Sequence, residues 1–188
     1  MVSMMNLGHT PVATWGLKSL HLSPDAKVLD CGCGGGANIK RLLKNCPQGI
    51  VEGIDYSEIS VEKARKLNQR AIRDGRCTVC QGSVAQMGFT DASFDVVTAF
   101  ETVYFWQDLP KCFQEVYRVL KPGGTFLICN ESNGDTNKDK KWTDIIGGMT
   151  IYKDTELKAY LEQAGFNDIQ IHKTKSWLCV TGRKHHQH

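Results

Sequence analysis

A glycine-rich turn that follows an acidic residue is the part of this sequence best suited to hold a small ligand. An apolar run leads into Asp30, four glycines follow between positions 32 and 36, and residues 39–43 then have helical spacing. Glycine accepts positive φ without steric cost and has no Cβ to keep a ligand away from the main chain. A nucleotide-like ligand is therefore expected on this backbone, facing the N-terminus of the helix.

Two cofactor templates fit the turn. Gly32, Gly34 and Ala37 satisfy the dinucleotide fingerprint, which permits alanine as its last member. Asp30 followed by Gly32, Gly34 and Gly36 satisfies instead a pattern associated with methyltransferases that use S-adenosylmethionine. The turn by itself leaves both cofactors open.

Strands that alternate with helices must position the turn. The hydrophobic pattern predicts strands over residues 27–30, 49–55, 77–81, 94–100, 125–129, 168–173 and 177–182. It predicts helices over residues 10–20, 39–45, 58–72, 109–120 and 155–164, the third of them capped by Ser57. This order favours a doubly wound α/β sheet that ends in a strand pair.

Length and composition indicate one compact domain. The 188 residues are 41% apolar and 23% charged, which suits a single domain over residues 1–188. We expect residues 1–24 to form a helical cap and the polar, glycine-containing segment 130–154 to form a lid-like excursion over the sheet edge.

Charge and hydropathy narrow the partners. The net charge of +3 includes no long run of one sign, so nucleic acid is not expected as a partner. No stretch approaches the roughly 20 apolar residues of a membrane span, and residues 1–10 carry neither a basic nor an apolar segment. We therefore expect a cytoplasmic protein that acts without a membrane partner.

The eight cysteines are interpreted as free thiols, because no export signal accompanies them. Two close pairs, Cys31 with Cys33 and Cys77 with Cys80, have the ligand type of a tetrahedral zinc site. Both pairs lie in apolar, strand-like stretches where cysteine serves as a small hydrophobic residue. We therefore expect no metal.

Several motifs together decide between the two cofactors. Segments 28–36, 53–57, 94–97, 118–126 and 161–166 resemble those of class I S-adenosylmethionine-dependent methyltransferases, in the type 11 or ubiquinone-biosynthesis-like group. The Leu-Lys-Pro-Gly-Gly run at residues 120–124 is the most telling, because a dinucleotide-binding unit does not call for it. The resemblance covers roughly residues 27–184, almost the whole chain.

The resemblance implies a Rossmann-like, doubly wound, seven-stranded and mostly parallel sheet with an antiparallel strand in its C-terminal hairpin. S-adenosylmethionine would lie across the carboxyl ends of the first strands. Asp30 and the backbone at Gly32 and Gly34 would then serve the methionine end, and Asp55 would accept from both ribose hydroxyls. The other implied cofactor-binding residues are Tyr56 against the adenine, Ser83, Val84, Ala99 and Phe100.

One position departs from the family. Gly-Asp-Ala is the commoner form where this chain has Gly82-Ser83-Val84. An aspartate there would accept a hydrogen bond from the adenine amino group, and the uncharged hydroxyl of Ser83 makes a weaker one. Adenine selectivity is therefore expected to rest more on backbone groups around Val84.

Methyl transfer is an in-line displacement that asks mainly for positioning, with a base where the nucleophile carries a proton. The candidate bases are Glu101, His9 and, less favoured, Glu131, and none lies in a diagnostic motif. Aromatic residues Trp15, Tyr104, Trp142 and Tyr152 are candidates to line an apolar acceptor pocket, although core packing explains such side chains equally well.

Residues 99–102 lack the Asn/Asp-Pro-Pro-Tyr/Phe motif typical of enzymes that methylate exocyclic amines of nucleic acids. A small-molecule acceptor is therefore favoured. Two alternatives stay open: a non-catalytic subunit that binds S-adenosylmethionine, and an NAD-dependent oxidoreductase.

Overall fold

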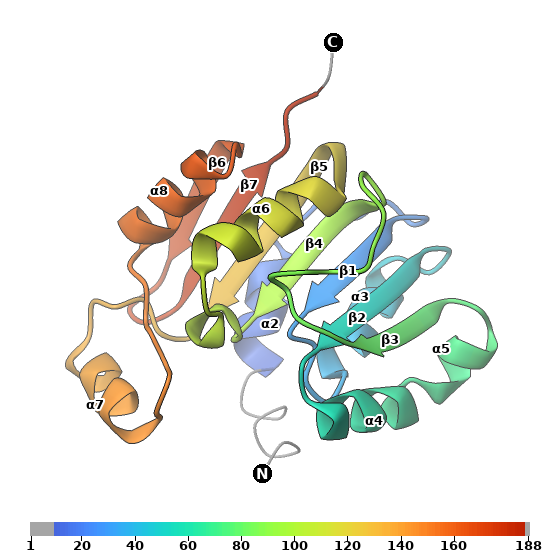
Figure 1. Ribbon diagram of the computed structural model, residues 1–188, viewed down its shortest axis with the longest axis horizontal. Helices are drawn as coiled ribbons and strands as arrows, with labels where there is room; N and C mark the ends of the chain where they lie inside the picture. Colours follow the sequence, from blue (N-terminus) through green and yellow to red (C-terminus); the bar gives the residue numbers. More distant parts are fainter. Residues whose placement is uncertain (1–9, 187–188) are drawn as a thin grey trace.

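The computed structural model describes residues 10–186 and shows a seven-stranded sheet with helices on both faces (Figure 1). The strand order is β3-β2-β1-β4-β5-β7-β6, and β7 is the antiparallel strand. The strands are β1 (Lys27–Cys31), β2 (Ile50–Asp55), β3 (Cys77–Gln81), β4 (Phe94–Phe100), β5 (Leu120–Asn130), β6 (Asn167–Lys173) and β7 (Leu178–Arg183). The predicted sheet is thereby confirmed.

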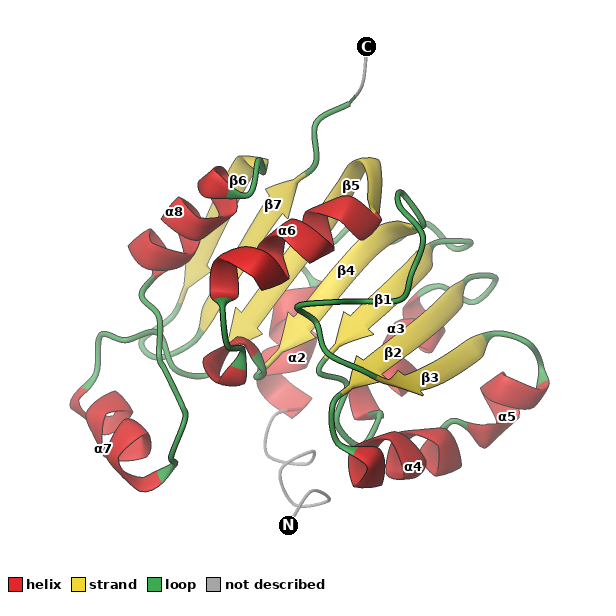
Figure 2. Ribbon diagram, in the orientation of Figure 1, coloured by secondary structure: helices red, strands yellow, loops and turns green. Residues whose placement is uncertain are grey.

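Helices lie on both faces of the sheet, and α7 stands apart from it (Figure 2). The longer ones are α2 (Thr10–Leu17), α3 (Ala37–Asn45), α4 (Glu58–Leu67), α6 (Leu109–Val119), α7 (Asn137–Ile145) and α8 (Asp154–Gln163). Two short elements, α5 (Gln69–Arg73) and the 3-10 helix η1 (Val103–Phe105), complete the described part. Helices α6 and α8 cover one face, while α2, α3 and α4 pack on the other.

Alternation along the strands divides the core between the faces. Leu29 and Val97 face α6 and α8, whereas Val28 and Val96 face α3 and α4. Helix α2 closes a third cluster over β5 and β7, which includes Val12 and Cys129. These buried side chains hold the strands and helices together.

Several predicted elements differ from the structure. The helix expected over 10–20 ends at Leu17. The single helix expected over 58–72 is divided at Asn68, whose buried side-chain amide donates to the carbonyls of Gly36 and Ala64 at 3.1 and 3.0 Å. The strand expected at 125–129 begins earlier, at Leu120, because Leu120 already pairs with Phe94 before a bulge. The 130–154 excursion contains a helix, α7, that no hydrophobic stripe indicated.

Strand β3 is one outer edge of the sheet. The guanidinium of Arg65, on α4, donates from Nε and Nη2 to the carbonyl oxygen of Val79, at 2.9 and 2.7 Å. A long cationic side chain thus covers part of this edge.

The eight cysteines are free thiols, and seven of them are buried. Within residues 10–186, no group of three or more metal-ligating side chains lies together. In the same range, no helix has the length and apolar character needed to cross a bilayer.

Candidate functional site

The carboxyl ends of β1, β2, β3 and β4 meet at one edge of the sheet, the lower edge in Figure 1. The glycine turn follows β1, Asp55 ends β2, and Glu101 follows β4. Parallel pairing therefore gathers these residues from distant positions in the sequence. Ligands of open α/β sheets bind at such an edge.

The glycine turn is held by its backbone. The N–H groups of Gly32 and Cys33 donate to the carbonyl of Ile54 at 2.8 and 3.1 Å, and that of Gly34 donates to Oδ2 of Asp55 at 2.9 Å. Gly32, Gly34 and Gly36 all have positive φ, which glycine alone adopts freely. The turn is thus fixed to β2 at three donors.

Gly32 and Gly34 have different surroundings. A Cβ on Gly32 would lie 1.9 Å from Oγ1 of Thr102, so this glycine permits close packing against the segment after β4. A Cβ on Gly34 would meet nothing within 4 Å. The backbone at Gly34 therefore borders open space, where a ligand can approach the main chain.

Asp30 is almost completely buried, with 1% of its surface exposed. Its Oδ1 accepts from the hydroxyl of Thr98, its neighbour on β4, at 2.7 Å. Burial raises the pKa of Asp30 to about 7, and the charge of nearby Asp55 acts in the same direction. A cation next to Asp30 would favour its carboxylate form.

Asp55 connects three segments of the edge. Besides accepting from Gly34, it accepts from the backbone of Ser57 through Oδ1 at 2.9 Å, and its own carbonyl accepts from Gly82 at 2.9 Å. Ser57 then caps α4 by accepting from Ser60. The next residue, Tyr56, is 78% exposed.

Ser83 and Val84 lie in the segment after β3. The Ser83 hydroxyl accepts from the backbone of Ala85 at 3.2 Å, and Val84 is buried in the core cluster under α6. Ser83 and Val84 therefore lie next to the end of β2, because the N–H of the preceding Gly82 donates to the carbonyl of Asp55.

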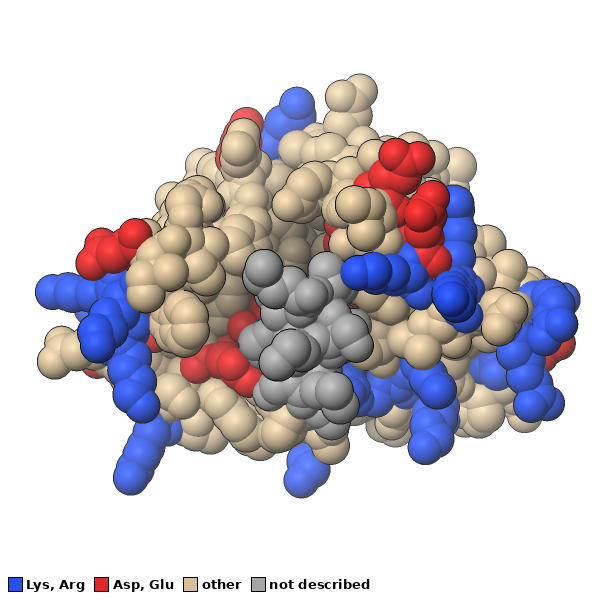
Figure 3. Space-filling model, turned by 90° about the horizontal axis from the view of Figure 1, so that it is seen from below, with Lys and Arg blue, Asp and Glu red and all other residues tan. Residues whose placement is uncertain are grey.

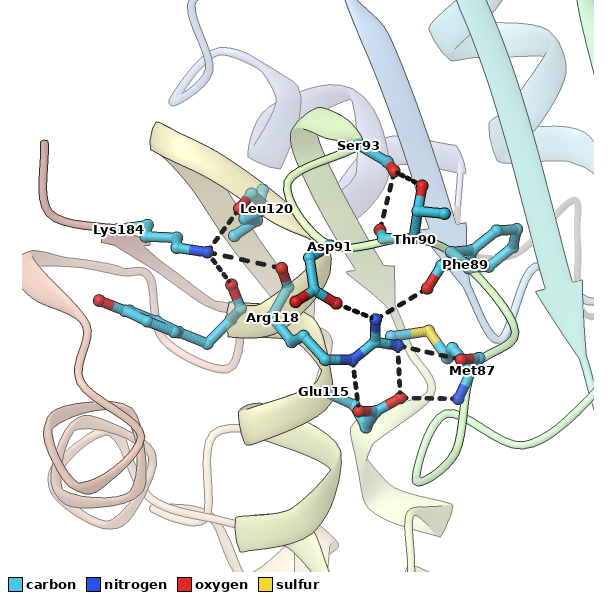
Figure 4. Close-up of polar contacts among 10 residues, drawn as sticks. Met87, Phe89, Thr90, Asp91, Ser93, Glu115, Arg118, Leu120 and Lys184 are labelled. Carbon is cyan, nitrogen blue, oxygen red and sulfur yellow. Dashed lines mark hydrogen bonds and ion pairs between the residues drawn. The ribbon is translucent and has the colours of Figure 1, made fainter. Parts of the chain in front are cut away.

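Arg118, on α6, secures the rest of that segment (Figure 4). Its guanidinium donates to the carbonyls of Met87 and Phe89 at 3.0 and 2.8 Å and pairs with Asp91 and Glu115. Glu115 also accepts from the backbone of Met87 at 2.8 Å. The sequence indicates Arg118 only as part of a family motif, because nothing in it shows which carbonyls the guanidinium would bind.

Glu101 follows β4 with a left-handed backbone, φ +56, which is uncommon outside glycine. Its Oε1 accepts from the hydroxyl of Tyr104 at 3.1 Å and from the backbone N–H of Glu131. Burial raises the pKa of Glu101 to about 8, and the charge of Glu131 adds to the rise. This carboxyl therefore changes charge near neutral pH.

No ring contact among the described residues joins the aromatic candidates Trp15, Tyr104, Trp142 and Tyr152 to one another. Tyr104 is buried and its hydroxyl donates to Glu101. Trp15 packs on Trp177, on the face of the sheet that α2 covers, with ring centroids 5.8 Å apart. Tyr152 is half-buried against Tyr160. Trp142 is 49% exposed on α7, a helix that stands off the sheet in Figure 1.

Three other candidates from the sequence are Ala99 and Phe100, expected to bind the cofactor, and His9, a candidate base. Ala99 and Phe100 are buried at the end of β4, so only their backbone borders the edge. His9 lies outside the described residues. The structure brings the expected cofactor residues to one end of the sheet and describes two candidate bases there. These are Glu101 and Glu131, and the backbone N–H of Glu131 donates to Oε1 of Glu101.

Sequence reasoning missed Thr98, Thr102 and Asn130. Thr98 is a hydroxyl within an otherwise apolar stretch, 96–100, and that contrast was the available signal. Asn130 ends β5 fully buried, and neither its Oδ1 nor its Nδ2 has a hydrogen-bond partner among the described residues.

Comparison with known proteins adds independent findings. The family model described as "Methyltransferase domain" matches residues 29–128. The chain is 32% identical to the cycloartenol-C-24-methyltransferase of Arabidopsis thaliana over 159 residues, which cover 80% of this chain and 47% of that one. It therefore spans about half the length of this curated relative.

Solved structures share the fold. A putative methyltransferase in complex with the Trm112 methyltransferase activator of Haloferax volcanii superposes with a TM-score of 0.86 at 22% identity, covering 98% of this chain and 94% of that one. A SAM-dependent methyltransferase from Aquifex aeolicus gives a TM-score of 0.78 at 21% identity, with 97% and 98% covered.

Proposed function

The chain belongs to the class I S-adenosylmethionine-dependent methyltransferases, and from that membership we propose that it transfers a methyl group from this cofactor to a small-molecule acceptor. The observation that carries the proposal is the glycine turn. Gly34 has positive φ, open space on its Cβ side and a hydrogen bond to Asp55. A ligand at this place would lie between the turn and the end of β2.

The residues present fit the cofactor. When bound, S-adenosylmethionine supplies a methyl group on a positively charged sulfur. The open side of Gly34 leaves room that a side chain would fill. Asp30 and Asp55 supply negative charge at the ends of β1 and β2, and the exposed ring of Tyr56 offers a surface on which the adenine ring can stack. NAD is disfavoured because the family match decides the cofactor.

Asp55 has a double role in this proposal. A carboxylate has room for about four hydrogen bonds. Two are used by the N–H groups of Gly34 and Ser57, at 2.9 Å each, so the carboxylate orients the turn and keeps capacity for ribose hydroxyls.

Glu101 is the proposed base for acceptors whose nucleophile carries a proton. A pKa near the working pH is what a general base needs, and the pKa of Glu101 is raised to about 8. Tyr104 and the backbone of Glu131 fix the carboxyl at the end of β4. The catalytic gain would come mainly from alignment, which supplies about 7–11 kcal/mol in favourable cases.

The acceptor class follows from the relatives and from the absence of a nucleic-acid motif. The curated relatives are named as methyltransferases of cycloartenol and of 24-methylenesterol, both small apolar molecules. Since this chain spans only part of them, we propose the class and not one compound.

Equilibrium binding tests the cofactor half of the proposal. We expect the purified chain to bind S-adenosylmethionine and its demethylated product, and not NAD. Asp55→Ala should weaken the binding by about 1–3 kcal/mol, because the ribose hydroxyls and Gly34 lose a charged partner. NAD affinity without a response to S-adenosylmethionine would overturn the assignment.

A transfer screen with labelled cofactor tests the other half. The acceptors are sterols, phenols, quinol precursors, amines and thiols. Binding of the cofactor without transfer to any of them would favour the remaining alternative, a non-catalytic subunit that binds S-adenosylmethionine.

A further inference from the structure

Helix α7 presents an apolar pair that nothing in the described structure covers. Ile145 is 70% exposed and Trp142 is 49% exposed, whereas most large apolar side chains of the protein are buried. They are three positions apart, so they lie on one face of the helix. Lys138 and Lys141 lie four positions before Trp142 and Ile145, so they share that face, and both are exposed.

The helix is held at its base and not along its outer face. Asp139 is buried and its Oδ2 accepts from the backbone of Gly134 and Thr136, at 3.0 and 3.2 Å. Lys173 of β6 joins the two ends of the excursion by pairing with Asp135 and Asp154, at 2.7 and 3.2 Å. The outer face therefore stays exposed on a fixed support.

Charge around the apolar pair is positive. Lys138 and Lys141 lie on the same face of α7 as the pair, and Lys140 lies on the opposite face. None of the three lysines has an ion pair within residues 10–186. Lys153, against Gly134, and Lys175, whose carbonyl accepts from Asn133, add two exposed ammonium groups at the base. Figure 3 shows a group of blue side chains at the end of the molecule where α7 lies.

The nearby acids do not cancel this charge. Asp139 is buried in its backbone hydrogen bonds, and Asp135 and Asp154 already pair with Lys173. Asp144 is the one carboxylate exposed on α7. The exposed charge of the helix is therefore +2, from three lysines and one aspartate.

We propose that the Trp142–Ile145 face of α7, with the lysines around it, docks on the surface of an anionic lipid bilayer. Tryptophan is amphipathic and favours the interface between water and lipid, and isoleucine buries its side chain among the acyl chains. Clustered lysines attract anionic headgroups within a Debye length of the surface. The patch supplies both parts of such a contact.

A protein partner fits this patch less well. A stable protein interface buries about 800 Å² on each partner and depletes lysine at its centre. Here two apolar side chains lie among several exposed lysines. The earlier expectation of no membrane partner rested on the lack of a spanning segment, which has no bearing on contact at the surface.

Vesicle co-sedimentation of the full chain tests the proposal. We expect binding to vesicles of phosphatidylcholine with about one third phosphatidylserine, little binding to phosphatidylcholine alone, and release at high salt. The double variant Trp142→Ala/Ile145→Ala and the triple variant Lys138→Glu/Lys140→Glu/Lys141→Glu should each lower the partition coefficient by about tenfold or more.

Two matched controls keep the test specific. Ile50→Ala/Leu67→Ala removes two exposed apolar side chains elsewhere, and Lys44→Glu/Lys63→Glu/Lys66→Glu makes the same charge change on α3 and α4. Both controls should bind the anionic vesicles as the parent chain does, and thermal melts should show all four variants folded.

Three results would overturn the proposal. The first is no binding to anionic vesicles. The second is binding that the α7 variants leave unchanged. The third is a soluble dimer that Trp142→Ala/Ile145→Ala dissociates while vesicle binding is absent, since the face would then join two copies of the chain. None of these readouts depends on methyl transfer.

Discussion

The hydroxyl of Tyr104 donates to Oε1 of Glu101 across 3.1 Å, and its oxygen accepts from the backbone N–H of Ser132 at 3.0 Å. The carbonyl of Tyr104 accepts in turn from Thr150 at 2.8 Å. Tyr104 therefore joins the proposed base to both ends of the excursion that carries α7. Movement of the excursion would reach Glu101 through Tyr104 and through the backbone N–H of Glu131, which donates to the same oxygen.

Tyr104→Phe should shift the pH dependence of transfer. The hydroxyl lowers the pKa of Glu101, so its loss raises this pKa further above its ordinary value. The acid limb of kcat/KM should then move to higher pH, and activity at neutral pH should fall by about tenfold, because a hydrogen bond to a charged group is worth about 1.5–3 kcal/mol.

The control for Tyr104→Phe is Trp106→Phe. It removes a neighbouring hydrogen bond, from Nε1 to the hydroxyl of Thr102 at 3.2 Å, without touching Glu101. If both variants keep the acid limb of the parent chain, Glu101 is not the base.

Gly34→Val should abolish cofactor binding and leave a folded domain. Gly75, in the turn between α5 and β3, is the matched control, because it also has positive φ and open space around its Cβ position. Both valines should destabilise the fold by about 1–2 kcal/mol or somewhat more, through left-handed strain. Calorimetric titration should show loss of cofactor binding in Gly34→Val alone. Equal cofactor affinity in the two variants would show that the cofactor does not bind at the glycine turn.

Cofactor affinity should increase as pH rises through about 7. The pKa of Asp30 is raised from 3.8 to about 7 in the folded protein, so the folded protein keeps a proton that the unfolded chain has lost between these values. The stability of the free protein therefore falls as pH rises from 3.8 to about 7. A cationic ligand favours the carboxylate, so its binding releases the proton. Titrations across this pH range should show the increase, and Asp30→Asn should flatten it. A parent chain with pH-independent affinity contradicts the placement of the cation near Asp30.

Asn130→Leu should stabilise the protein. A buried amide without partners costs about 1–3 kcal/mol, and leucine has a similar shape without polar atoms. Denaturant titration should show a higher midpoint with an unchanged slope. A lower midpoint would mean that the amide has a bound water or ligand as its partner.

The sequence predicted the sheet because its strands are short apolar runs between glycine-rich or proline-rich turns. Residues 77–81 and 94–100 match β3 and β4 at both ends. The helix break at Asn68 was not predictable, because it depends on a hydrogen bond to Gly36, 32 residues away. Local periodicity does not carry such contacts.

The candidate site was predictable where chemistry follows from backbone conformation. Gly34 and Asp55 belong to a strand, turn and helix whose order alone brings them to the carboxyl edge. Trp142 and Trp15 were both predicted to line a pocket, because the sequence does not show which way an aromatic side chain points. In the structure, Trp142 lies on α7, which stands apart from the sheet, and Trp15 packs on Trp177.

The contact of Arg65 with the carbonyl of Val79 bears on the behaviour of the protein at high concentration. An outer strand with unpaired backbone groups is a template on which a second chain can add a strand, and such pairing propagates into aggregates. Two guanidinium donors occupy an acceptor in the middle of β3, and the positive charge repels the same edge of another copy. Arg65 lies on a helix and not in the sheet, yet its contact with β3 disfavours the addition of a second chain and so favours solubility.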